Sequence, residues 1–158
     1  MRIRPATPAD LDAVAALHRR SILTLCGGHY TPAQLTEWTA VLLPAAYVML
    51  RETRTMLVAD DGGALLGFGV VDPAESIINA TYVSPEAPRR GVGRRLMAAM
   101  EDAARDRGCT RLRLNATRNA VPFYEALGYA REGDATNRLP SGVELPCVAM
   151  SRSLDGAV

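Results

Sequence analysis

Residues 77–95 read IINATYVSPEAPRRGVGRR. The first seven of them are rich in β-branched and aromatic side chains, which favour a strand. Residues 84–90 contain two prolines and are typical of a loop. From Val92 onward, apolar residues recur at helical spacing until Gly108 ends the pattern. The stretch therefore predicts a strand, a turn with two glycines, and a helix.

The turn itself, PRRGVGRR at residues 88–95, supports two interpretations. Its glycines allow a sharp bend and close approach of a ligand to backbone N–H groups, and a helix N-terminus attracts anions. Cations at such a terminus are unfavourable by ~0.3–1 kcal/mol each, a cost that a bound pyrophosphate would reverse. A solvated arginine-rich turn explains these residues equally well. Leu96 stands where a dinucleotide-binding fingerprint needs its third glycine, so that class is excluded.

The flanking sequence alternates strand and helix patterns. Upstream we expect strands at residues 2–5, 56–59 and 65–71, one helix capped by Thr7, a second helix from residue 31, and a short apolar segment from Pro44 to Leu50. Downstream we expect a strand at residues 110–114, a short helix capped by Asn119, and two closing strands from Tyr129 and over 143–150. This order predicts a mixed α/β fold in a single domain over residues 1–158.

Composition excludes several functional classes. All 18 basic residues are arginine, so neither a Walker A lysine nor a Schiff-base lysine is present. The net charge of +1 and the mixed charges of residues 101–107 argue against a nucleic-acid-binding protein. Two histidines without a paired spacing argue against a catalytic metal. Three scattered cysteines and short apolar stretches predict a cytoplasmic protein with reduced thiols and no membrane segment.

Two motifs in the right order resemble the GNAT superfamily of acetyl-CoA-dependent N-acyltransferases. The turn at residues 88–93, preceded by TYVSPE at 81–86, is similar to the family's Gln/Arg-x-x-Gly-x-Gly/Ala turn, with Pro88 where Gln or Arg is usual. Residues 115–129, NATRNAVPFYEALGY, are similar to the family's second cofactor-contacting segment. The opening RPATPADL is similar to its first strand and helix.

The resemblance implies a fold and a cofactor site. The fold would be a central mixed, mostly antiparallel sheet with helices on both faces and with the fourth and fifth strands splayed apart to admit acetyl-CoA. Backbone groups near Tyr82 and Val83 would hold the thioester, and Asn119 and Phe123 would line the pantetheine end. The pyrophosphate would be held by the turn residues Arg89, Arg90, Gly91, Val92, Gly93, Arg94 and Arg95.

The resemblance also implies catalytic roles. Tyr124 matches the family's general acid, since a phenol of pKa ~10 keeps its proton at neutral pH and can protonate a leaving thiolate. On the residues alone, an ordinary packed tyrosine is the simpler interpretation. Glu75 lies where some members place a catalytic carboxylate; a merely solvated glutamate, with a water relayed through backbone carbonyls as the base, is the alternative.

The acceptor cannot be identified from the sequence beyond a small-molecule amine or a peptide amine. In the family, the region of His29 and Tyr30 borders the acceptor pocket, whereas Trp38 is expected to pack in the core. Assembly as a homodimer is left open. The second candidate function is a non-catalytic acetyl-CoA-binding sensor, which would need the turn at residues 88–95 but not Tyr124.

Overall fold

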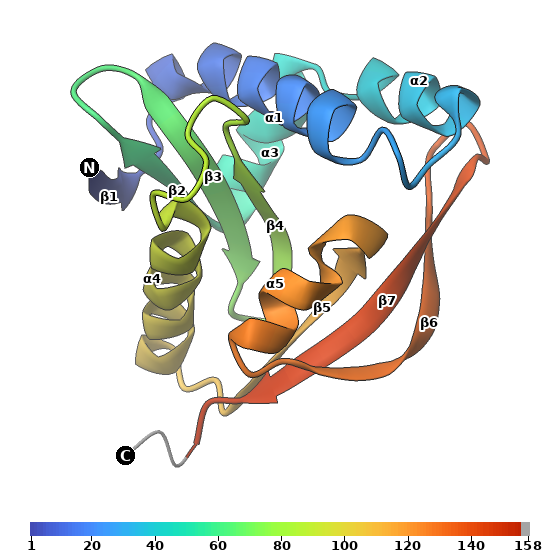
Figure 1. The fold of residues 1–158 in the computed structure, drawn as a ribbon. Coiled ribbons are helices and arrows are strands. Elements are labelled where there is room, and N and C mark those ends of the chain that lie inside the picture. The colour runs from blue at the N-terminus through green and yellow to red at the C-terminus, as the bar shows by residue number, and fades with distance from the viewer. Residues whose placement is uncertain (156–158) are drawn as a thin grey trace.

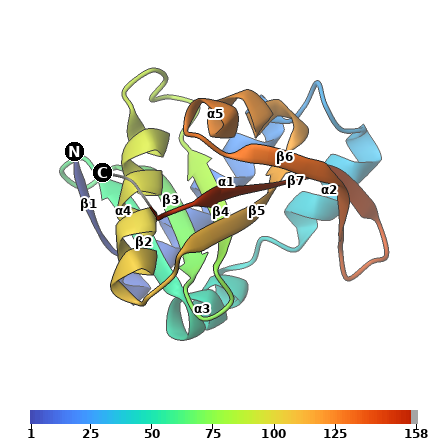
Figure 2. The same ribbon diagram turned by 90° about the horizontal axis from the view of Figure 1, so that it is seen from below.

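The computed structural model describes residues 1–155 and contains one seven-stranded sheet with helices on both faces (Figures 1 and 2). The N-terminal half comprises β1 (Arg2–Pro5), η1 (Pro8–Asp10), α1 (Leu11–Leu25), α2 (Pro32–Ala40), α3 (Pro44–Thr53), β2 (Thr55–Asp60), β3 (Leu65–Asp72) and β4 (Ile77–Val83). The remainder comprises α4 (Val92–Asp106), β5 (Arg111–Thr117), η2 (Arg118–Ala120), α5 (Val121–Ala126), β6 (Ala130–Arg138) and β7 (Glu144–Ser153). No helix within residues 1–155 is both long and apolar enough to cross a lipid bilayer.

The strand order is β1-β2-β3-β4-β5-β7-β6, and β4–β5 is the parallel pair in an otherwise antiparallel sheet. The β4–β5 ladder consists of the single pair Ile77–Arg113, whereas the β3–β4 ladder runs from Gly67–Val83 to Asp72–Ile77. Beyond that pair the two strands diverge (Figure 1). The expected mixed α/β fold, with helices on both faces and splayed fourth and fifth strands, is confirmed.

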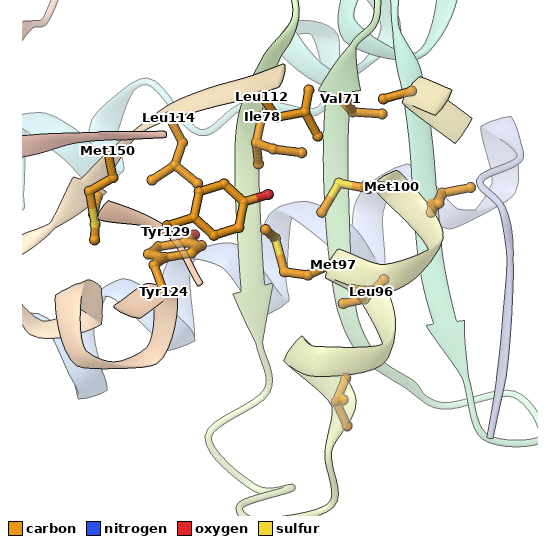
Figure 3. Close-up of a cluster of buried hydrophobic side chains, with 14 of the residues drawn as sticks. Val71, Ile78, Leu96, Met97, Met100, Leu112, Leu114, Tyr124, Tyr129 and Met150 are labelled. Atoms are coloured by element: carbon orange, nitrogen blue, oxygen red, sulfur yellow. The ribbon is translucent and has the colours of Figure 1, made fainter. Parts of the chain in front are cut away.

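Side chains of the central strands alternate between two cores, as the period of a strand requires. On β2, Met56 and Val58 pack with α1 and α3, while Leu57 and Ala59 face the opposite core beneath α4. The second core continues through α5 and β5 and contains Tyr124 and Tyr129 (Figure 3). Because both faces are covered, β2 and β3 read as continuous apolar runs in the sequence.

Two glycines of β3 bring α4 close to the sheet. A Cβ atom at Gly67 would lie 2.9 Å from the Tyr82 carbonyl oxygen and 2.9 Å from a Val92 methyl carbon. At Gly69 it would lie 2.6 Å from the terminal carbon of Met100. The absence of side chains at these positions therefore sets the height of α4 above β3 and β4, and with it the position of the α4 N-terminus.

The β6–β7 ribbon extends beyond the sheet to reach α2 (Figure 1). The Gln34 side chain donates to the Glu144 carbonyl at 3.0 Å, and the Tyr30 hydroxyl donates to the Pro146 carbonyl at 2.7 Å. Leu145 packs into a small core with Tyr30 and Trp38. These contacts close the space between the helical layer and the C-terminal ribbon.

Two local expectations were wrong. Residues 44–53 form the helix α3, where only a short apolar segment was expected, and Pro44 stands in its first turn, a position that proline favours. Asn119 does not cap the short helix: it lies within η2, and its side-chain oxygen accepts a hydrogen bond from the Cys26 thiol at 3.4 Å. Gly108 and Gly128 do end α4 and α5 with left-handed backbones, at φ +87° and +94°.

His18 is buried where α1 covers the sheet. Its Nδ1 lies 2.7 Å from the Tyr47 hydroxyl, and its ring centroid lies 4.1 Å from that of Tyr82 and 5.2 Å from that of Phe68. Nε2 has no hydrogen-bond partner among the described residues. Burial lowers the pKa of His18 to about 3, so the imidazole is neutral in the folded protein at neutral pH.

We expect His18 to make the protein acid-sensitive. Between pH 6.5 and about 3 the unfolded chain binds a proton at His18 that the folded chain does not, so the free energy of unfolding rises with pH across this window. Fully developed, this slope is about 1.4 kcal/mol per pH unit. Urea unfolding at several pH values should show a shallower slope for His18→Leu than for the wild type.

The comparison of wild type with His18→Leu isolates the effect of His18 on the pH dependence of stability. The Arg4 guanidinium lowers the pKa of Asp10 to about 2, and Asp10 therefore adds its own pH dependence equally to both proteins. Parallel stability profiles for wild type and variant between pH 4 and 6 would contradict the assignment of a neutral His18.

Candidate active site

The first cavity, of about 360 Å³, lies beside the open end of the β4–β5 pair and is called here the α5 cavity. Its lining includes Thr81, Tyr82 and Val83 from β4, Asn119 from η2, and Phe123 and Tyr124 from α5. Five residues that the sequence predicts as cofactor-binding residues or as the general acid therefore surround one cavity. The polar atoms of Ser21 and Cys26 complete its wall on the α1 side.

The N-terminus of α4 borders this cavity. A Cβ atom at Gly93 would lie 3.0 Å from the Phe123 ring and 3.4 Å from a Val83 methyl group. The lack of a side chain at Gly93 thus allows the first turn of α4 to pack closely against α5. Gly91 is exposed and left-handed, with φ +72°, and Val92 is buried in the core, so Val92 offers a ligand only its backbone.

The four arginines of the turn are not equivalent. Arg90 pairs with Asp61 at 3.3 Å, and Arg95 donates to the Met1 carbonyl oxygen at 3.0 Å. Arg89 and Arg94 are exposed and make no hydrogen bond or ion pair with any residue in the range 1–155. Arg89 also has a left-handed backbone, at φ +60°. Two guanidinium groups are therefore free for a ligand at this helix end.

Tyr124 lies where the α5 cavity meets the gap between β4 and β5. Its ring packs against that of Tyr129, with centroids 6.0 Å apart (Figure 3), and against that of Phe123, with centroids 5.0 Å apart. Burial raises the pKa of Tyr124, and the neighbouring Thr81 side chain opposes that shift only in part. The phenol is consequently protonated throughout the neutral range.

The second cavity, of about 290 Å³, lies between α1, α2, α3 and the β6–β7 ribbon and is called here the ring cavity. Six of its lining side chains carry rings: His18, Tyr30, Trp38, Tyr47, Phe68 and Tyr82. Tyr82 and Thr117 line the ring cavity, the α5 cavity and a small space of about 40 Å³ that separates β4 from β5. The two cavities therefore meet at the strand gap.

Glu75 is not part of this arrangement. It lies exposed in the turn before β4, at the end where β4 and β5 are paired, and lines a separate surface pocket with Arg111 and Glu132. Tyr82 is five residue steps along β4 from Ile77, a span of about 17 Å at ~3.3 Å per residue. The expectation that Glu75 serves as the general base is therefore not supported: a residue that precedes β4 lies at the wrong end of the strand.

On the ring-cavity side, sequence reasoning found some residues and missed others. Tyr30 is buried and lines the ring cavity, whereas His29 is exposed and lines neither cavity. Trp38 packs in the core as expected but also lines the ring cavity. His18 was not singled out, although a polar residue four positions from Val14 and from Ile22, on the apolar face of a helix, is a usable signal.

Within residues 1–155, no three His, Cys, Asp or Glu side chains lie close enough together to hold a metal ion.

The sequence and fold of this chain were compared with those of known proteins, and the matches are acetyltransferases. The family description "Acetyltransferase (GNAT) domain" fits residues 26–143. The chain is 28% identical over 143 residues to the uncharacterized N-acetyltransferase YhfO of Bacillus subtilis, covering 84% of this chain and 91% of that protein.

Two crystal structures share the fold. A GCN5-related N-acetyltransferase from Rhodopseudomonas palustris matches with a TM-score of 0.89 and 29% identity, over 96% of this chain and 94% of that one. The PaiA N-acetyltransferase of Thermoplasma acidophilum, solved in complex with coenzyme A, matches with a TM-score of 0.76 and 18% identity, over 96% and 98% of the two chains. With the family description spanning well over half of its residues, the chain belongs to the GNAT acetyltransferase family.

Proposed function

We propose that this chain transfers the acetyl group of acetyl-CoA to an amine, with the cofactor in the α5 cavity and the amine in the ring cavity. The observation that carries the proposal is the β4–β5 gap, where the two cavities meet at Tyr82 and Thr117. Because all seven strands belong to one sheet, we also take residues 1–158 as a single N-acetyltransferase domain.

The N-terminal turn of α4 is suited to the pyrophosphate. Left-handed residues at positions 89 and 91 alternate with other backbone conformations, a pattern that turns successive N–H groups toward a common anion. The helix terminus adds a partial positive charge. Arg89 and Arg94, which have no partner among the described residues, supply two full charges, and the Thermoplasma acidophilum relative was solved with coenzyme A bound.

The strand gap is suited to the reacting atoms. Acetyl-CoA supplies a thioester whose carbonyl carbon accepts the lone pair of a neutral amine; the C–N bond forms and the C–S bond breaks with its electron pair on sulfur. Beyond Ile77 the edge of β4 toward β5 has no strand partner in the described chain, so backbone groups near Tyr82 and Val83 remain available. N–H groups on that edge would stabilise negative charge on the carbonyl oxygen.

Tyr124 is assigned as the acid that protonates the leaving sulfur. It lines both the α5 cavity and the strand gap. Burial raises its pKa, yet burial also raises the pKa of a thiol in the same place, so the donor and acceptor stay matched. The phenolate recovers a proton as the amide nitrogen loses one through water, and the net reaction consumes no proton.

The amine must arrive as its free base. Glu75 lines a separate pocket, and among residues 1–155 no carboxylate lines the α5 cavity, the strand gap or the ring cavity. We infer that a proton leaves the amine through water and backbone carbonyl groups. Burial in the ring cavity assists this step, because a desolvated ammonium has a lowered pKa.

The cofactor assignment predicts unequal effects of the arginines. Acetyl-CoA at saturation should raise the melting temperature of the wild type, since a ligand of the folded state stabilises it. Arg89→Ala and Arg94→Ala should each weaken acetyl-CoA binding about three- to tenfold, as measured by isothermal titration, because each removes a free phosphate partner.

Arg107→Ala, at the opposite end of α4, provides the control, since it removes the same charge without touching the turn. Equal loss of affinity in Arg94→Ala and Arg107→Ala would show that only net charge matters. An unchanged melting temperature with acetyl-CoA would refute the cofactor assignment as a whole.

The acid assignment predicts the effect of Tyr124→Phe. The change keeps the ring and removes only the proton donor, so single-turnover acetylation should slow by ~10²–10⁴ while acetyl-CoA affinity changes little. Tyr129→Phe is the matched control, because its hydroxyl is buried in the neighbouring core and lines neither cavity. Full activity of Tyr124→Phe would remove this residue from the chemistry. Tight acetyl-CoA binding without turnover on any amine would favour the sensor function instead.

A further inference from the structure

The lining of the ring cavity contains no charged side chain. Its walls are formed by rings and leucines, and its polar groups are uncharged amides and hydroxyls. His18, the one lining residue able to become a cation near neutral pH, is held neutral by burial. The cavity therefore offers a bound molecule neither a carboxylate nor a guanidinium.

Charged groups near the cavity do not change this. The Arg118 guanidinium lies over the Tyr30 ring, 5.0 Å from its centroid, and is not among the residues that line the cavity. At the tip of the β6–β7 ribbon, Arg138 and Glu144 neutralise each other in an ion pair of 2.8 Å. Neither feature provides a free counter-charge inside the cavity.

The absence of counter-charge restricts the acceptor. A second ammonium group, as in a polyamine or an aminosugar antibiotic, would be desolvated without a carboxylate to pair with it. The carboxylate of a free amino acid would be desolvated without a cation. Burial of an unpaired charge is among the most costly events in a protein interior, so both kinds of molecule are disfavoured.

The polar groups are distributed in a way that orients an amine. Asn79 and Tyr82 of β4 and Thr117 at the end of β5 line both the ring cavity and the β4–β5 gap. Asn115 donates to the Asn137 side chain at 3.2 Å, which closes part of the polar wall. Trp38, Tyr47 and Phe68 form the apolar remainder, where an aromatic or alicyclic body would be covered by edges and faces of rings.

We propose that the acceptor is a monoamine with an uncharged, ring-sized apolar body, of the arylalkylamine class, bound as its free base with the nitrogen toward the β4–β5 gap. A volume of about 290 Å³ accommodates one such body and no extended oligosaccharide. This inference rests on the proposed acetyl transfer and adds the substrate class of the same site.

The test compares amines that differ by one charge. Thiol release from saturating acetyl-CoA is measured with phenethylamine, benzylamine and cyclohexylamine, and then with phenylalanine, 1,5-diaminopentane and kanamycin, at equal free-base concentrations. Phenethylamine and phenylalanine form the sharpest pair, since they differ only in a carboxylate. The best uncharged amine should exceed every charged one by about 100-fold or more in kcat/KM.

A designed counter-charge should redirect the specificity. Leu139 is half-buried, lines the ring cavity and directly follows β6. Leu139→Asp should raise kcat/KM for 1,5-diaminopentane relative to phenethylamine by at least about tenfold, whereas the isosteric Leu139→Asn should leave that ratio unchanged.

The outcomes separate the two proposals. A wild-type preference for phenylalanine, diaminopentane or kanamycin, or no turnover of any uncharged amine, overturns the substrate class while acetyl transfer can still stand. A melting temperature unmoved by acetyl-CoA overturns the proposed function itself.

Discussion

The incomplete pairing of β4 with β5 is the constraint on which the candidate site depends. A parallel pair held at Ile77 and Arg113 alone leaves the rest of both strand edges without the hydrogen bonds that backbone groups require. In an ordinary sheet this would be a defect. Here the unpaired edges meet two cavities that share Tyr82 and Thr117, and the proposed function uses this gap as the path between the acetyl donor and the amine.

The position of the anion-binding turn follows from packing around that gap. Gly67 and Gly69 let α4 approach β3, and Gly93 lets its first turn contact Phe123 and Val83. The helix terminus is thereby fixed beside the α5 cavity, where its charge is useful. Of the four arginines that crowd the turn, Arg90 and Arg95 are bound to the protein's own surface and Arg89 and Arg94 remain free. The sequence does not distinguish the four arginines, whereas the structure shows that two of them contact other parts of the protein and two are available to a ligand.

The ring cavity shows how burial can set both specificity and chemistry. The same low-polarity surroundings that keep His18 neutral would disfavour a charged acceptor in the proposed site and favour loss of a proton from its ammonium group. A strong general base is then less necessary, which agrees with the absence of a carboxylate from the lining of both cavities. The neutral wall and the raised pKa of Tyr124 are therefore two consequences of one desolvated interior.

Local sequence determined the secondary-structure elements and pointed to many of the residues that are proposed to bind acetyl-CoA. Short-range sequence features are enough to predict the strands, the helix ends and the two motifs. These features are the strand alternation, the glycines at positions 91, 108 and 128, which have left-handed backbones in the structure, and the segments around Gly93 and Tyr124. Only the tertiary structure showed that Pro44 starts a helix, that Glu75 lies at the closed end of β4, and that Gly93 serves packing against Phe123. The ring cavity likewise could not be predicted, because His18, Tyr47, Phe68 and Leu145 come from four distant elements. Whether a side chain lines a cavity, pairs with a neighbour or faces solvent depends on contacts between such elements, and that information is not contained in local periodicity.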